Sequence, residues 1–409
     1  MTQEDTTILR QIYDYANRAN PYPLWARLRE TPVCWQEDVH YPEGTYVVSG
    51  YREIKAVLHD PRVSSELRHL GQTGEQLGST MEDRFNVLDP PEHDRLRRLA
   101  MRHFGPPEHP EYLEQLRPEI VRIVTTLLDQ VQGQRQFDFV ERFAYPLPVT
   151  VICQILGVPL EDEPEFHRWV TAFTENETGE TEEQRRLMQQ AVSNLDQYMA
   201  GLVERHRAQP GEDMLSRMAT DTGPEGRMTD RYLVATATLL LFAGHETTVS
   251  LLSNGLLTLL RHPDILERLR REPDLIPAAV EEMLRYETPT PFAPNRVTLD
   301  EISLAGTTIP KGAPVTVAFA AGNRDPARFP NPDRFDPERP DNEHLGFGSG
   351  IHSCFGAPLA RMEAQIAFSE LVRRLEQPRL VVDPPPYRPS PFQRGPEHLL
   401  IAVEGVRES

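Results

Sequence analysis

Cysteine is scarce in this chain, which has three in 409 residues: Cys34, Cys153 and Cys354. They lie far apart and form no Cys-x-x-Cys pair, which excludes the dense disulfide framework of a small secreted protein. Sparse cysteines of this kind are typical of a reducing compartment, so we expect a cytoplasmic protein.

Long apolar stretches are missing too. No run approaches the ~18 residues that a membrane-spanning helix needs, so we expect no membrane insertion. The first ten residues carry Glu4 and Asp5, and they lack the basic segment followed by an apolar one that marks a signal peptide. The sequence therefore predicts neither an anchor nor a leader.

Positive charge is in short supply. Lys and Arg together number 43 against 62 Asp and Glu, for a net charge of −19, and the only lysines are Lys55 and Lys311. So acidic a balance argues against nucleic-acid binding. No low-complexity linker or internal repeat divides the 409 residues, so we expect one large domain over 1–409.

What the chain does have is helical periodicity. Apolar residues recur at helical spacing through the ranges 51–59, 111–132, 146–156, 161–175, 182–207, 229–261, 278–286 and 359–375. Between them lie strand-like stretches at 33–36, 45–49 and 314–320, and hairpins at 302–309 and between 380–382 and 399–403. The sequence predicts a mainly helical fold with small sheets. It also predicts a functional or mobile segment at 60–87, where no period holds.

One cysteine has an unusual setting. Cys354 lies in the stretch Phe-Gly-Ser-Gly-Ile-His-Ser-Cys-Phe-Gly at 347–356, directly ahead of the helical run at 359–375. The free N–H groups of a helix N-terminus favour a thiolate over a thiol, and glycines let a flat group approach the backbone. A thiolate held there is a soft metal ligand. The plainer alternative is a buried structural cysteine in a Gly-rich loop.

This stretch resembles the haem-binding loop of the cytochrome P450 family, Phe-Gly-x-Gly-x-His-x-Cys-x-Gly, at every fixed position. The resemblance implies the fold of that family, haem b as the cofactor, and Cys354 as the axial ligand of the haem iron. It also implies haem contacts from Phe347, Gly348, His352 and Gly356. Further family motifs follow in the expected order, so the resemblance covers nearly the whole chain.

Three more residues match haem contacts of the family. His93 and Arg97 are four residues apart, on one face of a predicted helix, and fit the pattern His-x-x-x-Arg. Arg296 resembles the family's second propionate arginine. A guanidinium suits a carboxylate because its N–H groups form a fork. Without the resemblance, His93 and Arg97 would be read as part of a solvated helix face.

Another motif interrupts the longest helical run. Ala-Gly-His-Glu-Thr-Thr at 243–248 puts a glycine, an acid and two threonines into a buried helix, where polar groups need partners. It matches a family motif, which implies that Gly244, Glu246 and Thr247 are catalytic, with Gly244 opening the helix and Thr247 delivering protons. Two alternatives stay open: Thr247 bonds back to a carbonyl, or Glu246 is locked in an ion pair.

A Glu-x-x-Arg pair, Glu282 and Arg285, lies between these motifs. By itself this pattern is weak evidence for a role, because such pairs are common on exposed helix faces. In this place it resembles the family's structural ion pair, which implies support of the fold and of the haem loop.

The substrate pocket, by the same resemblance, is built from 60–87, the helical hairpin 161–207 and the loop 289–295, with the turn 391–393 facing it. Its expected lining residues are Val87, Leu240, Ala243, Phe292, Ala293, Asn295 and Phe392. Asn295 is polar in an apolar strip, so it hydrogen-bonds either a substrate or its own loop.

The resemblance implies a monooxygenase that inserts one O₂-derived oxygen atom into a mainly apolar small molecule. Because no reductase is fused to the chain, the two electrons are expected from a separate ferredoxin or flavodoxin with its reductase. Two alternatives remain. One is an H₂O₂-driven peroxygenase, although relatives that use peroxide tend to replace the pair Glu246-Thr247. The other is a non-catalytic recruiting module of the same fold, whose haem loop would be lost.

Overall fold

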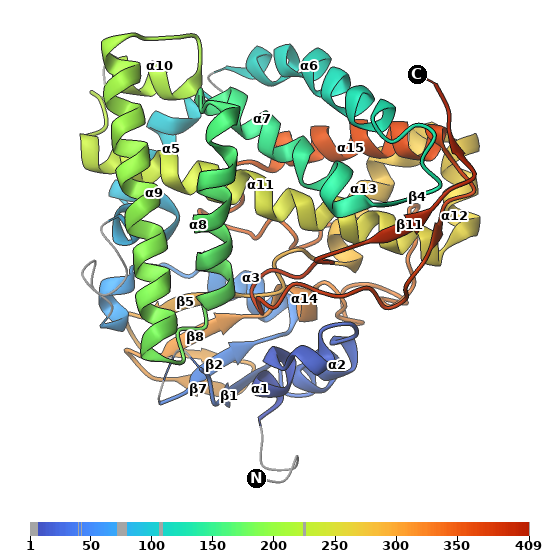
Figure 1. The fold of residues 1–409 in the computed structure, drawn as a ribbon. Coiled ribbons are helices and arrows are strands. Elements are labelled where there is room, and N and C mark those ends of the chain that lie inside the picture. Colours follow the sequence, from blue (N-terminus) through green and yellow to red (C-terminus); the bar gives the residue numbers. More distant parts are fainter. Residues whose placement is uncertain are drawn as a thin grey trace.

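Helices make up most of the computed structural model, which describes residues 7–39, 41, 43–71, 80–105, 109–223 and 226–408. They fill the upper part of the molecule in Figure 1, while a small sheet lies below them beside α1 and α2. The predicted mainly helical fold with small sheets is confirmed. The α-helices are α1 (Ile8–Tyr13), α2 (Tyr22–Arg29), α3 (Tyr51–His59), α5 (Glu92–Met101), α6 (Pro110–Asp129), α7 (Pro146–Leu156), α8 (Glu163–Asn176), α9 (Glu182–Ala208), α10 (Met214–Thr220), α11 (Asp230–Arg261), α12 (Pro263–Arg271), α13 (Ile276–Tyr286), α14 (Phe319–Gly322) and α15 (Ala357–Arg374).

The largest sheet has the strand order β1-β2-β8-β5-β3, in which β2 and β8 run parallel and the other neighbours antiparallel. Its register shifts between Ala293 and Arg296, so β5 carries a bulge there. Smaller sheets join β10-β11-β4, β12-β9 and β6-β7. The strands are β1 (Val33–Gln36), β2 (Thr45–Val48), β3 (Val63–Ser64), β4 (Gln136–Asp138), β5 (Ala293–Thr298), β6 (Ile302–Leu304), β7 (Thr307–Ile309), β8 (Pro314–Val317), β9 (Leu375–Glu376), β10 (Arg379–Leu380), β11 (Leu400–Ala402) and β12 (Gly405–Val406).

Helix α11 crosses the middle of the molecule, and the hairpin of α8 and α9 lies across it (Figure 1). Thr229 caps its first turn, because the threonine side chain accepts a hydrogen bond from the backbone of Tyr232. The helix contacts α7, α9, α13 and α15. Neighbours on several sides bury most of its surface, which explains its long uncharged run. No helix among the described residues combines the length and the apolar character needed to cross a membrane.

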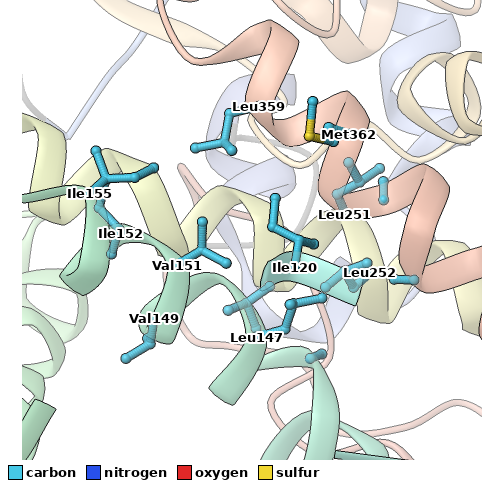
Figure 2. Close-up of a cluster of buried hydrophobic side chains, with 14 of the residues drawn as sticks. Ile120, Leu147, Val149, Val151, Ile152, Ile155, Leu251, Leu252, Leu359 and Met362 are labelled. Atoms are coloured by element: carbon cyan, nitrogen blue, oxygen red, sulfur yellow. The ribbon is translucent and has the colours of Figure 1, made fainter. Parts of the chain in front are cut away.

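The main core fills the space where α7, α11 and α15 meet (Figure 2). Leu251 and Leu252 come from α11, Leu359 and Met362 from α15, and a row of aliphatic side chains from α7. Ile152, Leu251 and Leu359 also face a cavity. The same close-packed layer therefore supports the fold and one wall of the site.

Two predicted elements differ from the structure. The range 289–296, expected to be an extended loop, contributes the start of β5, and the strand expected over 314–320 ends at Val317, where α14 follows. Short apolar runs do not distinguish a strand from a helix by periodicity. Part of the segment 60–87, residues 72–79, lies outside the described residues.

Candidate active site

A cavity of about 370 Å³ lies between α11, β5, the loop of Cys354 and the start of α15. The short helix η5 (Phe85–Val87) forms another wall. Most of the predicted site residues meet at this one place. Those that line the cavity are Val87, Arg97, Leu240, Ala243, Gly244, Thr247, Ala293, Asn295, Arg296, Phe347, Gly348, His352, Cys354 and Gly356.

The predicted pocket positions of Phe292 and Phe392 are wrong. Their rings pack against each other, with centroids 5.1 Å apart, and Phe292 also packs against Tyr13 at 5.3 Å. Both belong to the cluster around α1 and α2, away from the cavity wall. Alternation along an extended chain explains the error, because Ala293 faces the cavity and its neighbour Phe292 points to the other side.

Glu246 is buried and does not line the cavity. Its carboxylate pairs with Arg388 and lies 3.4 Å from Nε2 of His245. Burial alone would raise the pKa of Glu246, but the guanidinium of Arg388 and the neighbouring His245 lower it to about 2. The alternative that Glu246 is locked in an ion pair is therefore confirmed.

The expected opening of the helix at Gly244 is wrong, because α11 continues through it unbroken. A Cβ atom at this position would lie 2.7 Å from Cδ1 of Ile152, so glycine permits the close approach of α7. The hydroxyl of Thr247 donates a hydrogen bond to the carbonyl of Ala243, at 3.1 Å. Thr247 therefore does bond back within the helix, and its side chain also borders the cavity.

The thiol of Cys354 lies just before the N-terminus of α15. Backbone N–H groups of Gly356 and Ala357 donate to the sulfur, and Arg97 and Arg361 add positive charge. Burial nevertheless raises the pKa of Cys354, and these groups only reduce the rise. The helix terminus therefore acts in the expected direction, towards the thiolate, but burial outweighs it. A cation bound at the sulfur would add to the stabilisation of the thiolate.

The groups around this sulfur fit haem b. His93 Nε2 and His352 Nδ1 are buried and have no hydrogen-bond partner among the residues described. Burial lowers the pKa of Arg296 to about 10, and within the described part of the chain its guanidinium donates only to the neighbouring carbonyl of Asn295. A buried guanidinium calls for an anionic group, as the carboxylates of haem are, and a histidine ring nitrogen joins it where that nitrogen carries the proton. A Cβ atom on Gly356 would meet nothing within 4 Å, which leaves room for a flat ring beside the loop.

Sequence reasoning missed Glu363. This residue of α15 lines the cavity and is only 1% exposed, and its Oε2 has no hydrogen-bond partner within the described part of the chain. Burial raises the pKa of Glu363 to about 8, so the carboxyl is mostly neutral at pH 7. A signal was present, since an acid follows Met362 on the apolar face of a helical run.

The Glu282–Arg285 pair lies on α13, away from the cavity, and both side chains are 0% exposed. Arg285 donates two hydrogen bonds to the Glu282 carboxylate, at 2.7 and 2.8 Å. It also donates to the carbonyls of Asn323, Pro332 and Arg334, on the approach to the cysteine loop. The interpretation of this motif as a structural ion pair is confirmed.

Comparisons with known proteins identify the family of the chain. The family model described as Cytochrome P450 matches residues 34–399. Cytochrome P450 monooxygenase PikC of Streptomyces venezuelae is 39% identical over 423 aligned residues, covering 100% of this chain and 98% of the relative. The 6-deoxyerythronolide B hydroxylase of Saccharopolyspora erythraea is 38% identical, covering 94% and 96%.

Solved structures give the same result. The cytochrome P450 PksS of the Bacillus subtilis 168 bacillaene polyketide synthase matches with a TM-score of 0.87 at 32% identity, over 96% of this chain and 99% of that one. Agreement in family model, relatives and fold extends over nearly the whole chain. The chain therefore belongs to the cytochrome P450 family, as a haem b monooxygenase of small molecules.

Proposed function

We propose that Cys354 is the axial ligand of the haem iron and that the cavity beside it is where the substrate is oxygenated. His93, Arg97 and Arg296 bind the haem carboxylates, and Phe347, Gly348, His352 and Gly356 line the haem. One observation carries the assignment: a thiol before a helix N-terminus shares its cavity with the guanidinium groups of Arg97 and Arg296 and with His352, whose Nδ1 has no partner among the described residues. The whole chain, 1–409, is proposed to form a single haem domain.

Haem bound to a thiolate supplies the activation of O₂ with two electrons. The protein's part is to place the substrate, exclude water and deliver protons. Val87, Leu240, Ala243 and Ala293 give the cavity an apolar wall that holds the substrate and keeps stray water out. The Thr247 hydroxyl both donates and accepts, so it passes protons on at this wall. Glu246 acts through Arg388, as a positioning residue for that stretch of α11.

The two electrons are proposed to come from a separate ferredoxin or flavodoxin with its reductase, and the protein is proposed to work in the cytoplasm. All three cysteines are free thiols, which suits a reducing compartment. With a net charge of −19, the protein repels an acidic partner overall, so docking requires a local basic surface and is sensitive to salt.

A reduced-CO difference spectrum, followed by reconstitution, tests the proposal. We expect a band near the family's namesake wavelength. We further expect product from NAD(P)H and O₂ when a ferredoxin or flavodoxin and its reductase are added. Product from H₂O₂ alone, at an equal rate, would favour the peroxygenase instead. A purified, folded protein that takes up no haem would favour the recruiting module.

Thr247→Ala is expected to uncouple the reaction. Without the hydroxyl, protons reach the oxygen less selectively, so reductant is still consumed but more H₂O₂ and less product are released. The measurement is product formed per NAD(P)H, which should fall by about tenfold. Thr258→Ala is the matched control: Thr258 makes the same bond back along α11, to Asn254 at 2.8 Å, and lies outside the cavity. An unchanged ratio in Thr247→Ala would reduce Thr247 to a helix-packing residue.

Glu363→Gln is expected to stabilise the protein at alkaline pH. The folded pKa of about 8 exceeds the ordinary 4.5, so the wild type loses stability as pH rises between these values, and the amide does not. Each unit of pKa difference corresponds to about 1.4 kcal/mol, so the variant gains several kcal/mol at most in its free energy of unfolding. Urea unfolding at about pH 5 and about pH 9 measures it.

The matched control is Glu370→Gln on the same helix, where Glu370 forms an ion pair with Arg373 nearer the surface. This substitution should change the free energy of unfolding by less than about 1 kcal/mol, and the change should not grow with pH. If Glu363→Gln gains nothing between the two pH values, a haem-bound structure must give Glu363 a charged or hydrogen-bonded partner.

A further inference from the structure

The polar groups of the cavity divide into two sets. The ionisable ones belong to the cysteine loop and α15 or reach them: Arg97 donates to the carbonyl of Ser353 at 2.9 Å, and burial, followed by the positive charge of Arg296, lowers the pKa of His352. Apart from Arg296 of β5, the described residues of the remaining walls, on η5, α11 and β5, are apolar or carry uncharged amides and hydroxyls. Two of these are carboxamides on different elements, Asn86 in η5 and Asn295 in β5.

Asn295 is held in a defined orientation. It occupies the left-handed region, with φ 72°, at the bulge of β5. Asparagine is among the few residues other than glycine that tolerate this region well. The buried Tyr41 hydroxyl accepts a hydrogen bond from the Asn295 backbone N–H at 3.1 Å and donates to its Oδ1 at 3.0 Å. Because Tyr41 takes up the carboxamide oxygen, the amide nitrogen is left to face other partners.

That amide nitrogen has no acceptor among the described residues, and neither does that of Asn86. Donors in an otherwise apolar wall are satisfied by water while the cavity is open. A ligand that displaces this water has to offer an oxygen in its place, or the N–H groups are left unpaired at a cost in affinity. An ionic ligand would need a counter-charge on these walls. The cationic residue there is Arg296 of β5, which the proposed function assigns to a haem carboxylate, and the other described residues of η5, α11 and β5 that line the cavity are uncharged.

We propose that Asn295, positioned by Tyr41, donates a hydrogen bond to an oxygen acceptor of the substrate, with Asn86 as a second polar contact. The preferred substrates are accordingly neutral molecules with an apolar skeleton and a ketone, ester or lactone oxygen. Hydrocarbons and free carboxylates bind less well. The inference rests on the proposed function, because it assigns selectivity to the same cavity.

Two matched probe pairs test the inference, through the dissociation constants that the Soret shift of the holoprotein reports. Testosterone and 5α-androstane share one carbon skeleton and differ in the 3-ketone and the 17-hydroxyl, with the 4,5 double bond of testosterone as the one further difference. Methyl myristate against myristate isolates the charge on one chain. We expect testosterone to bind about tenfold tighter than 5α-androstane, and methyl myristate tighter than myristate, since a lost hydrogen bond is worth about this factor.

Asn295→Gly removes the carboxamide and still tolerates the positive φ. We expect this variant to weaken the binding of testosterone about fivefold to tenfold. The dissociation constant of 5α-androstane should stay unchanged within about twofold. Tyr41→Phe keeps the aromatic ring but removes the hydroxyl that orients the Asn295 carboxamide. It should therefore weaken the binding of testosterone about threefold. A merely structural role of Tyr41 would change both steroids alike. Asn86→Ala tests the second contact in the same way.

Three outcomes would overturn the proposal. In Asn295→Gly, the two steroids could lose affinity equally, or testosterone could lose none. In the wild type, myristate could bind more tightly than its methyl ester. A fourth is a lower haem content of Asn295→Gly before any ligand is added, which would assign the carboxamide to the haem carboxylates. Failure of the proposed function is distinguishable, because it would appear in the wild type as a missing reduced-CO band.

Discussion

Cys354→Ser is expected to abolish monooxygenase activity and the thiolate signature of the reduced-CO spectrum. A serine hydroxyl is a hard and weakly acidic ligand, and it cannot replace the electron density that a thiolate donates. The backbone N–H groups of Gly356 and Ala357 remain in place around the substituted side chain. The variant should therefore fold. The loss of activity and of the thiolate spectrum would then come from the missing sulfur ligand and not from misfolding. Haem content, the reduced-CO spectrum and product formation measure it.

Cys34→Ser is the matched control, since Cys34 is a free, half-buried thiol on β1 outside the cavity. It should keep both spectrum and activity. His352 is not expected to rescue the Cys354→Ser variant. Its ring packs edge-on against His93, with centroids 4.5 Å apart, and is held at that side of the cavity. Full activity and an unchanged spectrum in the serine variant would remove the central assignment.

The amphipathic helices expected from periodicity were predictable to within about three residues at each end. The helix expected over 51–59 is α3 itself, and the one expected over 182–207 ends one residue later. Their periodicity extends over many turns, and their starts are marked by local chemistry. Thr181 and Gln184, for example, form a capping box at the start of α9. Such signals lie within a few residues of each other, so the sequence shows them directly.

Contacts between distant segments were not predictable in the same way. The partner of Glu246 is Arg388, 142 residues away, and no local pattern points to it. The direction of Phe292 depends on how β5 pairs with β8, which only the assembled sheet determines. The motifs indicated which residues meet at the cavity. Packing decided which of them face it, and it also buried Glu363, which no motif marked.

Glu282→Ala is expected to prevent accumulation of folded, haem-containing protein. Both partners of the pair are 0% exposed, and removing one partner of a buried ion pair typically costs about 3–5 kcal/mol, because the other charge is left uncompensated. The Glu282 carboxylate also accepts from the backbone N–H of Asp336 at 2.9 Å and from Arg339 at 3.2 Å. Its loss therefore leaves several buried donors unpaired at once. Thermal unfolding and haem bound per chain measure the effect.

The matched control is Glu114→Ala on α6, because Glu114 and Arg117 have the same spacing as Glu282 and Arg285 but are 64% and 45% exposed. An exposed pair contributes about 0–1 kcal/mol, so this variant should fold and bind haem normally. Arg285→Lys separates charge from geometry. It keeps a cation opposite Glu282 but cannot reach the carbonyls of Asn323, Pro332 and Arg334 together with the carboxylate. If Arg285→Lys loses haem as fully as Glu282→Ala, the fork of hydrogen bonds, rather than the paired charge, holds the approach to the Cys354 loop in place.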